Sequence, residues 1–103
     1  MMYNVQYLPL AEEDVLEAVR YIAERLENPA AASALLDELD EAADGLSRFP
    51  YMGSPYHTDR PMRDELRMLP VKNYVLYYTV TEEAVEIRRF IHGKRDRSKL
   101  DWE

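Results

Sequence analysis

Cysteine is absent from this chain of 103 residues, and its absence excludes several kinds of chemistry. No disulfide, thiolate metal site or cysteine nucleophile can form, so the sequence is compatible with a reducing compartment. The N-terminal stretch lacks a basic region followed by a long apolar segment, and no apolar run approaches the roughly 18 residues that span a bilayer. We therefore expect a cytoplasmic protein that does not bind a membrane.

Motifs that hold phosphates, metals or a nucleophilic serine are missing as well. The chain has three glycines, and they form neither a phosphate-cradling loop nor a nucleophile elbow. His57 has only Asp59 near it in sequence, and no further ligands follow at the spacing of a zinc site. We expect no metal and no cofactor.

The composition that remains is that of an ordinary folded protein. Hydrophobic residues make up 47% and charged residues 32% of the chain, and the eight tyrosines argue against disorder. A chain of this length can build one hydrophobic core but not two separate ones. We predict a single domain over residues 1–103.

The net charge of −7 is distributed unevenly. Residues 1–48 carry eleven acids against three bases, whereas residues 88–99 carry six bases against Asp96 alone. The sequence thus joins an acidic first half to a basic C-terminal segment, where positive potential is concentrated.

Hydrophobic periodicity predicts a strand, two helices and then three strands. Residues 2–8 alternate as in a strand, and apolar residues then recur every three or four positions from Ala11. Asn28 and Pro29 indicate the start of a second helix that ends near Arg48. Residues 50–62 are rich in proline and are predicted to be a loop, followed by strands at 65–71, 74–81 and 84–92.

This order predicts an α+β domain, with a helical hairpin packed on one face of a mostly antiparallel sheet of about four strands. The first helix should bury a stripe that extends to Leu26. We expect one core, formed by Val5, Val15, Val19, Ile22, Leu35, Leu39, Leu46, Leu76, Val80 and Ile87.

The segment HGKRDRSK at residues 92–99 is the strongest candidate for function, because its imidazole and four cations suit the recognition of phosphate or other anions. The alternative is a solvated basic terminus that protects a strand edge from pairing. His92 and Arg95 are the candidate catalytic residues, although His92 is also compatible with a structural hydrogen bond at the strand end. The candidate target-binding residues are Arg67, Arg88, Arg89, Lys94 and Arg97. Arg88 and Arg89 are adjacent in a strand and should point to opposite faces.

Several segments in this order resemble the RelE/ParE toxin superfamily, whose members include plasmid stabilisation proteins. The matching stretches are YNVQYLPLAEEDV, ERLENPAAASALLDEL, LSRFPYMG, LRMLPVKNYVLYYTV and VEIRRFIHGKRD, which together cover nearly the whole chain. The resemblance implies a compact bacterial toxin of a type II toxin–antitoxin system. It also implies neutralisation by a cognate antitoxin whose C-terminal segment wraps around the toxin. The expected assemblies are a homodimer of the toxin or a heterotetramer of toxin and antitoxin.

The superfamily contains both ribosome-dependent mRNA endonucleases of the RelE type and gyrase poisons of the ParE type, and fold alone does not distinguish them. Arg95 matches the arginine of the nuclease GKR motif, but Val75 and Asp101 stand where an arginine and a tyrosine are expected. Arg63 and Glu65 likewise replace two lysines. NYVLYYTV and FIHGKRD resemble the ParE-type pattern, so a gyrase-directed toxin is favoured. An endoribonuclease with an atypical site and a degenerate, non-toxic antitoxin-binding module remain the alternatives.

Overall fold

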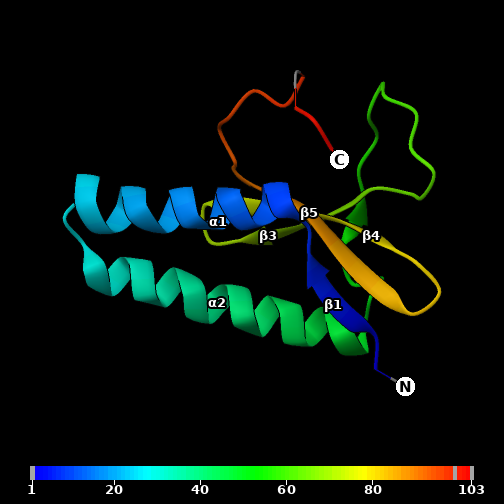
Figure 1. Cartoon of the computed structure of the whole chain (residues 1–103), viewed down its shortest axis with the longest axis horizontal. Coiled ribbons are helices and arrows are strands. Elements are labelled where there is room, and N and C mark those ends of the chain that lie inside the picture. The colour runs from blue at the N-terminus through cyan, green and yellow to red at the C-terminus, as the bar shows by residue number, and fades with distance from the viewer. Residues whose placement is uncertain (1, 99, 103) are drawn as a thin grey trace.

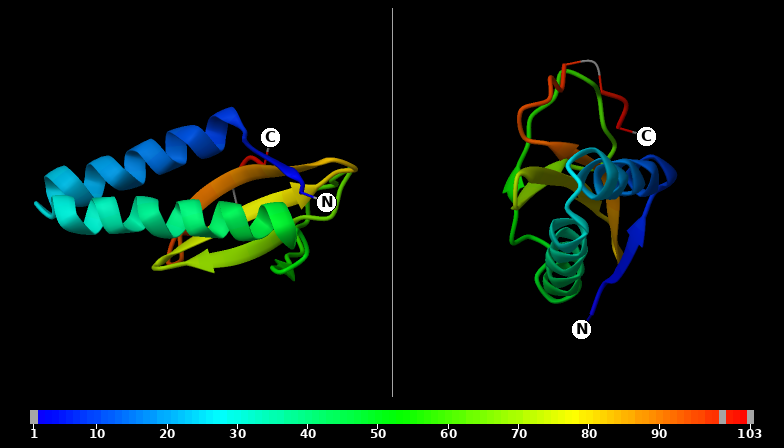
Figure 2. Two further views of the ribbon diagram at one scale, coloured as in Figure 1. Left: turned by 90° about the horizontal axis from the view of Figure 1, so that it is seen from below. Right: turned by 90° about the vertical axis from the view of Figure 1, so that its left-hand side faces the viewer.

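The computed structural model describes residues 2–98 and 100–102 and forms an α+β domain. Its elements are β1 (Asn4–Tyr7), α1 (Pro9–Arg20), a π-helical turn η1 (Tyr21–Arg25), α2 (Pro29–Arg48), β2 (Ser54–Pro55), β3 (Arg67–Val71), β4 (Tyr74–Val80) and β5 (Ala84–His92). The helices α1 and α2 lie side by side as a hairpin against one face of the sheet (Figures 1 and 2). The predicted fold class is confirmed. Neither helix of the described part of the chain is long and apolar enough to cross a membrane.

The sheet has the strand order β1-β5-β4-β3-β2, in which β1 pairs with β5 in parallel and the other pairs are antiparallel. The predicted strand count of about four differs from the five observed because β2 is only two residues long. It lies inside the proline-rich stretch that was expected to be a loop, where Ser54 and Pro55 pair with Met68 and Arg67. Such a short pairing leaves no periodic signal in the sequence.

The second helix begins where the sequence indicates. The Asn28 side chain accepts a hydrogen bond from the Ala31 backbone N–H at 3.1 Å, and Pro29 occupies the first helical position. The first helix departs from the prediction at its end, because η1 adds a π turn that rotates the following residues around the helix axis. Leu26, expected on the buried stripe, is consequently 55% exposed.

The sheet buries apolar side chains on both faces, so the predicted core is one of two clusters. Of the ten predicted core residues, Leu35, Leu39, Leu46, Leu76 and Ile87 are buried beneath the helices, Val5, Val15, Ile22 and Val80 pack partly buried against them, and Val19 is half-buried. A second cluster on the other face contains Tyr77, Ile91, Leu100 and Trp102. It forms because alternate residues of β4 face opposite sides, and the C-terminal segment folds back to cover the side away from the helices (Figure 2).

We expect Leu39→Ala to lower the free energy of unfolding by roughly 2 to 5 kcal/mol, because it leaves a cavity beneath the helices. Leu39 is 3% exposed, whereas Leu36 on the same helix is 40% exposed. Leu36→Ala is therefore the matched control and should change stability much less. Urea unfolding of the two variants and the parent measures the difference, and equal effects at the two positions would contradict this packing.

Candidate functional site

The basic C-terminal segment lies at the end of the sheet where β5 finishes. The Gly93 backbone N–H donates to the Asn73 carbonyl at 2.8 Å, which places the turn after β5 beside the turn between β3 and β4. Lys72 on one turn and Lys94 and Arg95 on the other are exposed. We call these three residues the basic end. Lys72 was missed in the sequence because only the antiparallel register of β3, β4 and β5 brings it to this position.

Arg89, a candidate target-binding residue, is buried in the structure. Its guanidinium makes two hydrogen bonds to the Asp14 carboxylate on α1, at 2.7 and 3.0 Å, and a third to the Asp101 carbonyl at 2.8 Å. Asp14 also accepts the backbone N–H of Phe90 at 3.0 Å. The hydrogen bonds to Asp14 raise the pKa of Arg89, so its guanidinium remains charged. Arg89 joins α1, β5 and the C-terminal segment.

Arg88 also reaches the C-terminal segment, so the prediction that Arg88 and Arg89 point to opposite faces of the sheet is wrong. Ile87 and Phe90 both belong to the cluster beneath the helices, which leaves the two arginines between them on the other face. The Arg88 guanidinium donates to the Thr79 hydroxyl at 3.0 Å, to the Trp102 carbonyl at 3.1 Å and to the Glu86 carboxylate at 3.3 Å. The pairing of β4 and β5 shifts at this point, since Tyr77 pairs with Arg89 but Tyr78 pairs with Ile87. This β-bulge leaves Arg88 unpaired in the ladder and lets the two neighbours Arg89 and Phe90 both reach Asp14.

Arg97 and Arg67, the next two candidates, are also held by internal bonds. Arg97 donates to the Tyr77 hydroxyl and, at 3.1 Å, to the Gly93 carbonyl, which closes the turn after β5. Arg67 donates to the Gly53 carbonyl at 2.6 Å and to the Tyr51 carbonyl at 3.1 Å, which fixes the loop before β2 against β3. Both side chains order loops, and a role of either in target binding stays a prediction.

His92 and Arg95, the candidate catalytic residues, come together at one pocket. His92 ends β5, and its Nδ1 accepts the Lys94 backbone N–H at 3.2 Å while its ring stands edge-on to Tyr74 at 5.2 Å. The Arg95 N–H donates to the His92 carbonyl at 3.0 Å. Within residues 2–98 and 100–102, the Arg95 guanidinium has no hydrogen-bond or ion-pair partner. The hydrogen bond from the Lys94 N–H gives His92 the structural role that the sequence allows. A catalytic role of His92 or Arg95 stays a prediction.

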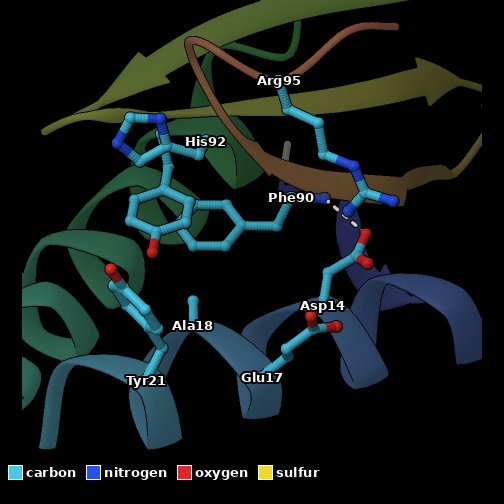
Figure 3. A pocket seen from close by; sticks show the side chains of 8 residues that line it. Asp14, Glu17, Ala18, Tyr21, Phe90, His92 and Arg95 are labelled. Atoms are coloured by element: carbon cyan, nitrogen blue, oxygen red, sulfur yellow. Dashed lines mark hydrogen bonds between the residues drawn. The ribbon is translucent and has the colours of Figure 1, made fainter. Parts of the chain in front are cut away.

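The pocket has a volume of about 400 Å³ and lies between α1 and the end of β5 (Figure 3). The helix contributes Asp14, Glu17, Ala18 and Tyr21, and the sheet side contributes Tyr74, Phe90, His92 and Arg95. His57 lies elsewhere, exposed in the loop. Among the described residues, no group of three or more His, Cys, Asp or Glu could hold a metal ion.

A second surface is the groove between the two helices, with a volume of about 630 Å³. Its floor includes Leu16 and Leu36, which are 60% and 40% exposed. Its rim carries the acids Glu12, Glu13 and Asp40. Burial and the Asp40 carboxylate together raise the pKa of Tyr7, beside the groove, from 10.0 to about 12. An apolar floor with an acidic rim suits an amphipathic segment that carries basic residues.

Comparisons with known proteins agree with this architecture. Residues 5–97 match the family described as the ParE toxin of type II toxin–antitoxin system, parDE. A chain of the chromosomal ParDE toxin–antitoxin system from P. aeruginosa is similar in structure, with a TM-score of 0.70 and 16% identity, over 88% of this chain and 96% of that chain. A chain of the RelBE2 toxin–antitoxin complex from Mycobacterium tuberculosis has a TM-score of 0.60 and 22% identity, over 96% of this chain and 95% of that chain. Comparison with curated protein sequences gives no significant match.

Proposed function

The chain belongs to the ParE toxin family of type II toxin–antitoxin systems, and from this membership we propose that it inhibits bacterial growth by binding DNA gyrase rather than by cleaving mRNA. In this proposal the basic end, Lys72, Lys94 and Arg95, contacts the target. The protein acts as a binding inhibitor, and cationic side chains on the two adjacent turns form charge-assisted contacts with the target.

The observation that carries the proposal is the internal use of the arginines. Cleavage of RNA through the 2′-hydroxyl needs a base, an acid at the leaving oxygen and cations beside the phosphorane. Arg88, Arg89 and Arg97 instead bond to protein carbonyls, carboxylates and hydroxyls. Val75 stands where the nuclease pattern has an arginine and supplies no cation, and Asp101 stands where that pattern has a tyrosine. This distribution favours binding over phosphodiester cleavage.

The test is to add the purified chain to gyrase with supercoiled DNA and, separately, to translating ribosomes. We expect inhibited supercoiling and trapped DNA breaks in the first reaction and intact mRNA in the second. Codon-phased cuts in mRNA would instead identify an endoribonuclease with an atypical site. No effect in either reaction, with no loss of growth on induction, would identify a non-toxic antitoxin-binding module.

We further propose that the groove between the helices receives a basic, amphipathic segment of the cognate antitoxin. Apolar antitoxin side chains would cover Leu16 and Leu36, and lysine or arginine would face Glu12, Glu13 and Asp40. Complementary charges of this kind mainly accelerate encounter between the partners.

Neutralising the rim in the triple variant Glu12→Gln, Glu13→Gln and Asp40→Asn should therefore slow antitoxin association roughly tenfold at low salt and flatten its salt dependence. Surface plasmon resonance at several salt concentrations, with the antitoxin encoded in the adjacent reading frame, measures the rate. The matched control is Asp37→Asn with Glu38→Gln and Glu41→Gln, which neutralises three exposed acids of α2 outside the groove. Equal slowing in both variants would show that only overall charge matters.

A further inference from the structure

The pocket between α1 and the end of β5 forms because of the residues that α1 directs toward the strand. Asp14, Glu17, Ala18 and Tyr21 follow the spacing of a single helical face, on which large apolar residues would ordinarily pack against a sheet. Here the face has a methyl group at Ala18, and β1 has already ended at the pairing of Tyr7 with Ile87. The end of β5 therefore faces α1 across open space.

Aromatic rings form the walls of this space. Tyr74 stacks on Phe90 with their ring centroids 4.9 Å apart and an interplanar angle of 8°. Tyr21 approaches from the helix and is 50% exposed, so its ring is available to a guest (Figure 3). Tyr21 is also the first residue of η1, and π turns frequently occur at functional sites. The pocket is thus shaped for a flat ring, with Ala18 as its floor.

Two opposite charges lie at the pocket and restrict the guest further. Asp14 is already occupied by Arg89 and the Phe90 N–H, but within the described part of the chain the Glu17 carboxylate has no hydrogen-bond or ion-pair partner. The Arg95 side chain lines the pocket from the sheet side and extends toward Asp14 (Figure 3). A carboxylate or phosphate guest would be repelled by Glu17, and an ammonium or guanidinium guest by Arg95. A neutral ring with a hydrogen-bond donor satisfies both.

We propose that this pocket anchors a tryptophan or tyrosine side chain of the antitoxin. The ring lies over Ala18 against Tyr21, and its N–H or O–H donates to Glu17. The exposed Arg95 side chain turns from Asp14 toward the ring and makes a cation–π contact with it. Large aromatic side chains in desolvated pockets are the residues that dominate protein interfaces. The antitoxin fits as the occupant because α1 borders both this pocket and the groove, so one segment that crosses the helix reaches both. The choice of occupant rests on the proposed function.

The first experiment uses small probes and does not depend on the antitoxin. N-acetyl-tryptophanamide is titrated into the isotope-labelled chain and followed by ¹H–¹⁵N correlation spectra. We expect saturable shifts at Ala18 and Phe90, none at Gly53 in the loop before β2, and weaker shifts with N-acetyl-argininamide. Ala18→Leu, which fills the floor, should abolish the shifts. Equal responses to both probes, or shifts that persist in Ala18→Leu, would contradict the proposal that this pocket binds an aromatic side chain.

The second experiment measures antitoxin affinity by calorimetry. Glu17→Ala removes the acceptor at an exposed position and should weaken the complex roughly tenfold, as expected for one hydrogen bond to a charged group. Glu38→Ala, an exposed acid of α2 away from the pocket, is the control and should bind like the parent. Ala18→Leu should weaken binding at least as much, and Ala30→Leu, at an exposed position of α2, controls for the added side chain; thermal melts confirm folding of each variant.

The outcomes separate the two proposals. If the parent binds the antitoxin and Glu17→Ala and Ala18→Leu bind equally well, the anchor is wrong while the proposed function stands. If the parent forms no antitoxin complex, the proposed neutralisation fails, and the antitoxin as occupant fails with it.

Discussion

Replacing Asp14 by alanine should lower the free energy of unfolding by roughly 3 to 5 kcal/mol, because it leaves the Arg89 charge buried and unpaired. The side chains of Asp14 and Arg89 are only 6% and 9% exposed, and two hydrogen bonds join them. The variant also removes the acceptor of the Phe90 N–H. Since small domains are stable by about 5 to 15 kcal/mol, this loss should remove much of the stability of the fold. Chemical denaturation measures it.

Two comparisons test whether the unpaired charge is the cause. Asp44→Ala breaks an ion pair with Arg48 whose side chains are more than half exposed, and it should cost less than about 1 kcal/mol. The double variant Asp14→Leu with Arg89→Met replaces the pair by apolar groups and should recover part of the loss, since no charge remains buried. Recovery should be incomplete because the Phe90 N–H still lacks its acceptor. A double variant less stable than Asp14→Ala would contradict this account.

The elements that the sequence predicts well are those whose signals are local. A run dense in β-branched and aromatic residues identifies β4, and alternating polar and apolar residues identify β5. The asparagine–proline pair identifies the start of α2, and Leu35 and Leu39 follow directly from the helical period. The ion pair between Asp14 and Arg89 joins residues 75 positions apart. In the sequence, Asp14 follows Glu12 and Glu13 near a helix N-terminus. Acids are favourable there, so nothing in the sequence indicates that Asp14 has a buried partner. Only tertiary packing reveals its partner.

The second apolar cluster escaped prediction for a related reason. Trp102 and Leu100 follow a basic stretch without periodicity, so no pattern indicates that they return to cover Tyr77. The carbonyls of Asp101 and Trp102 receive hydrogen bonds from Arg89 and Arg88, which hold the segment in place. Backbone acceptors leave no trace in the side-chain sequence.

At the candidate site, the sequence predicted the basic segment but not which of its cations are available to contact a target. Arg88, Arg89 and Arg95 have the same side chain, and only the β-bulge and the course of the C-terminal segment decide which are used internally. Lys72 joins the site through strand register. A functional assignment of a basic cluster therefore requires the hydrogen bonds of each guanidinium as well as the positions of its charges.

This division of the cations leads to a prediction about toxicity. Lys72→Ala, Lys94→Ala and Arg95→Ala should each weaken target binding by on the order of 1.5 to 3 kcal/mol, about tenfold or more, because each removes one charge-assisted contact. The combined variant should lose at least about a thousandfold. Gyrase inhibition, titrated with each purified variant, measures the steps, and growth on induction provides the cellular readout. Arg60→Ala, an exposed cation in the loop before β3, is the control and should inhibit like the parent.

A catalytic site would give a different pattern from a contact surface. Loss of one group that transfers a proton or stabilises a transition state abolishes turnover while leaving binding nearly intact. If His92→Ala or Arg95→Ala alone removed all activity with target affinity unchanged, the basic end would be a catalytic centre and the binding mechanism would be wrong. Arg88→Ala and Arg89→Ala form a separate class, because their guanidinium groups hold the C-terminal segment and, for Arg89, the helix α1. These two variants should lose toxicity in proportion to the fall in their melting temperature, whereas the variants of the basic end should melt like the parent.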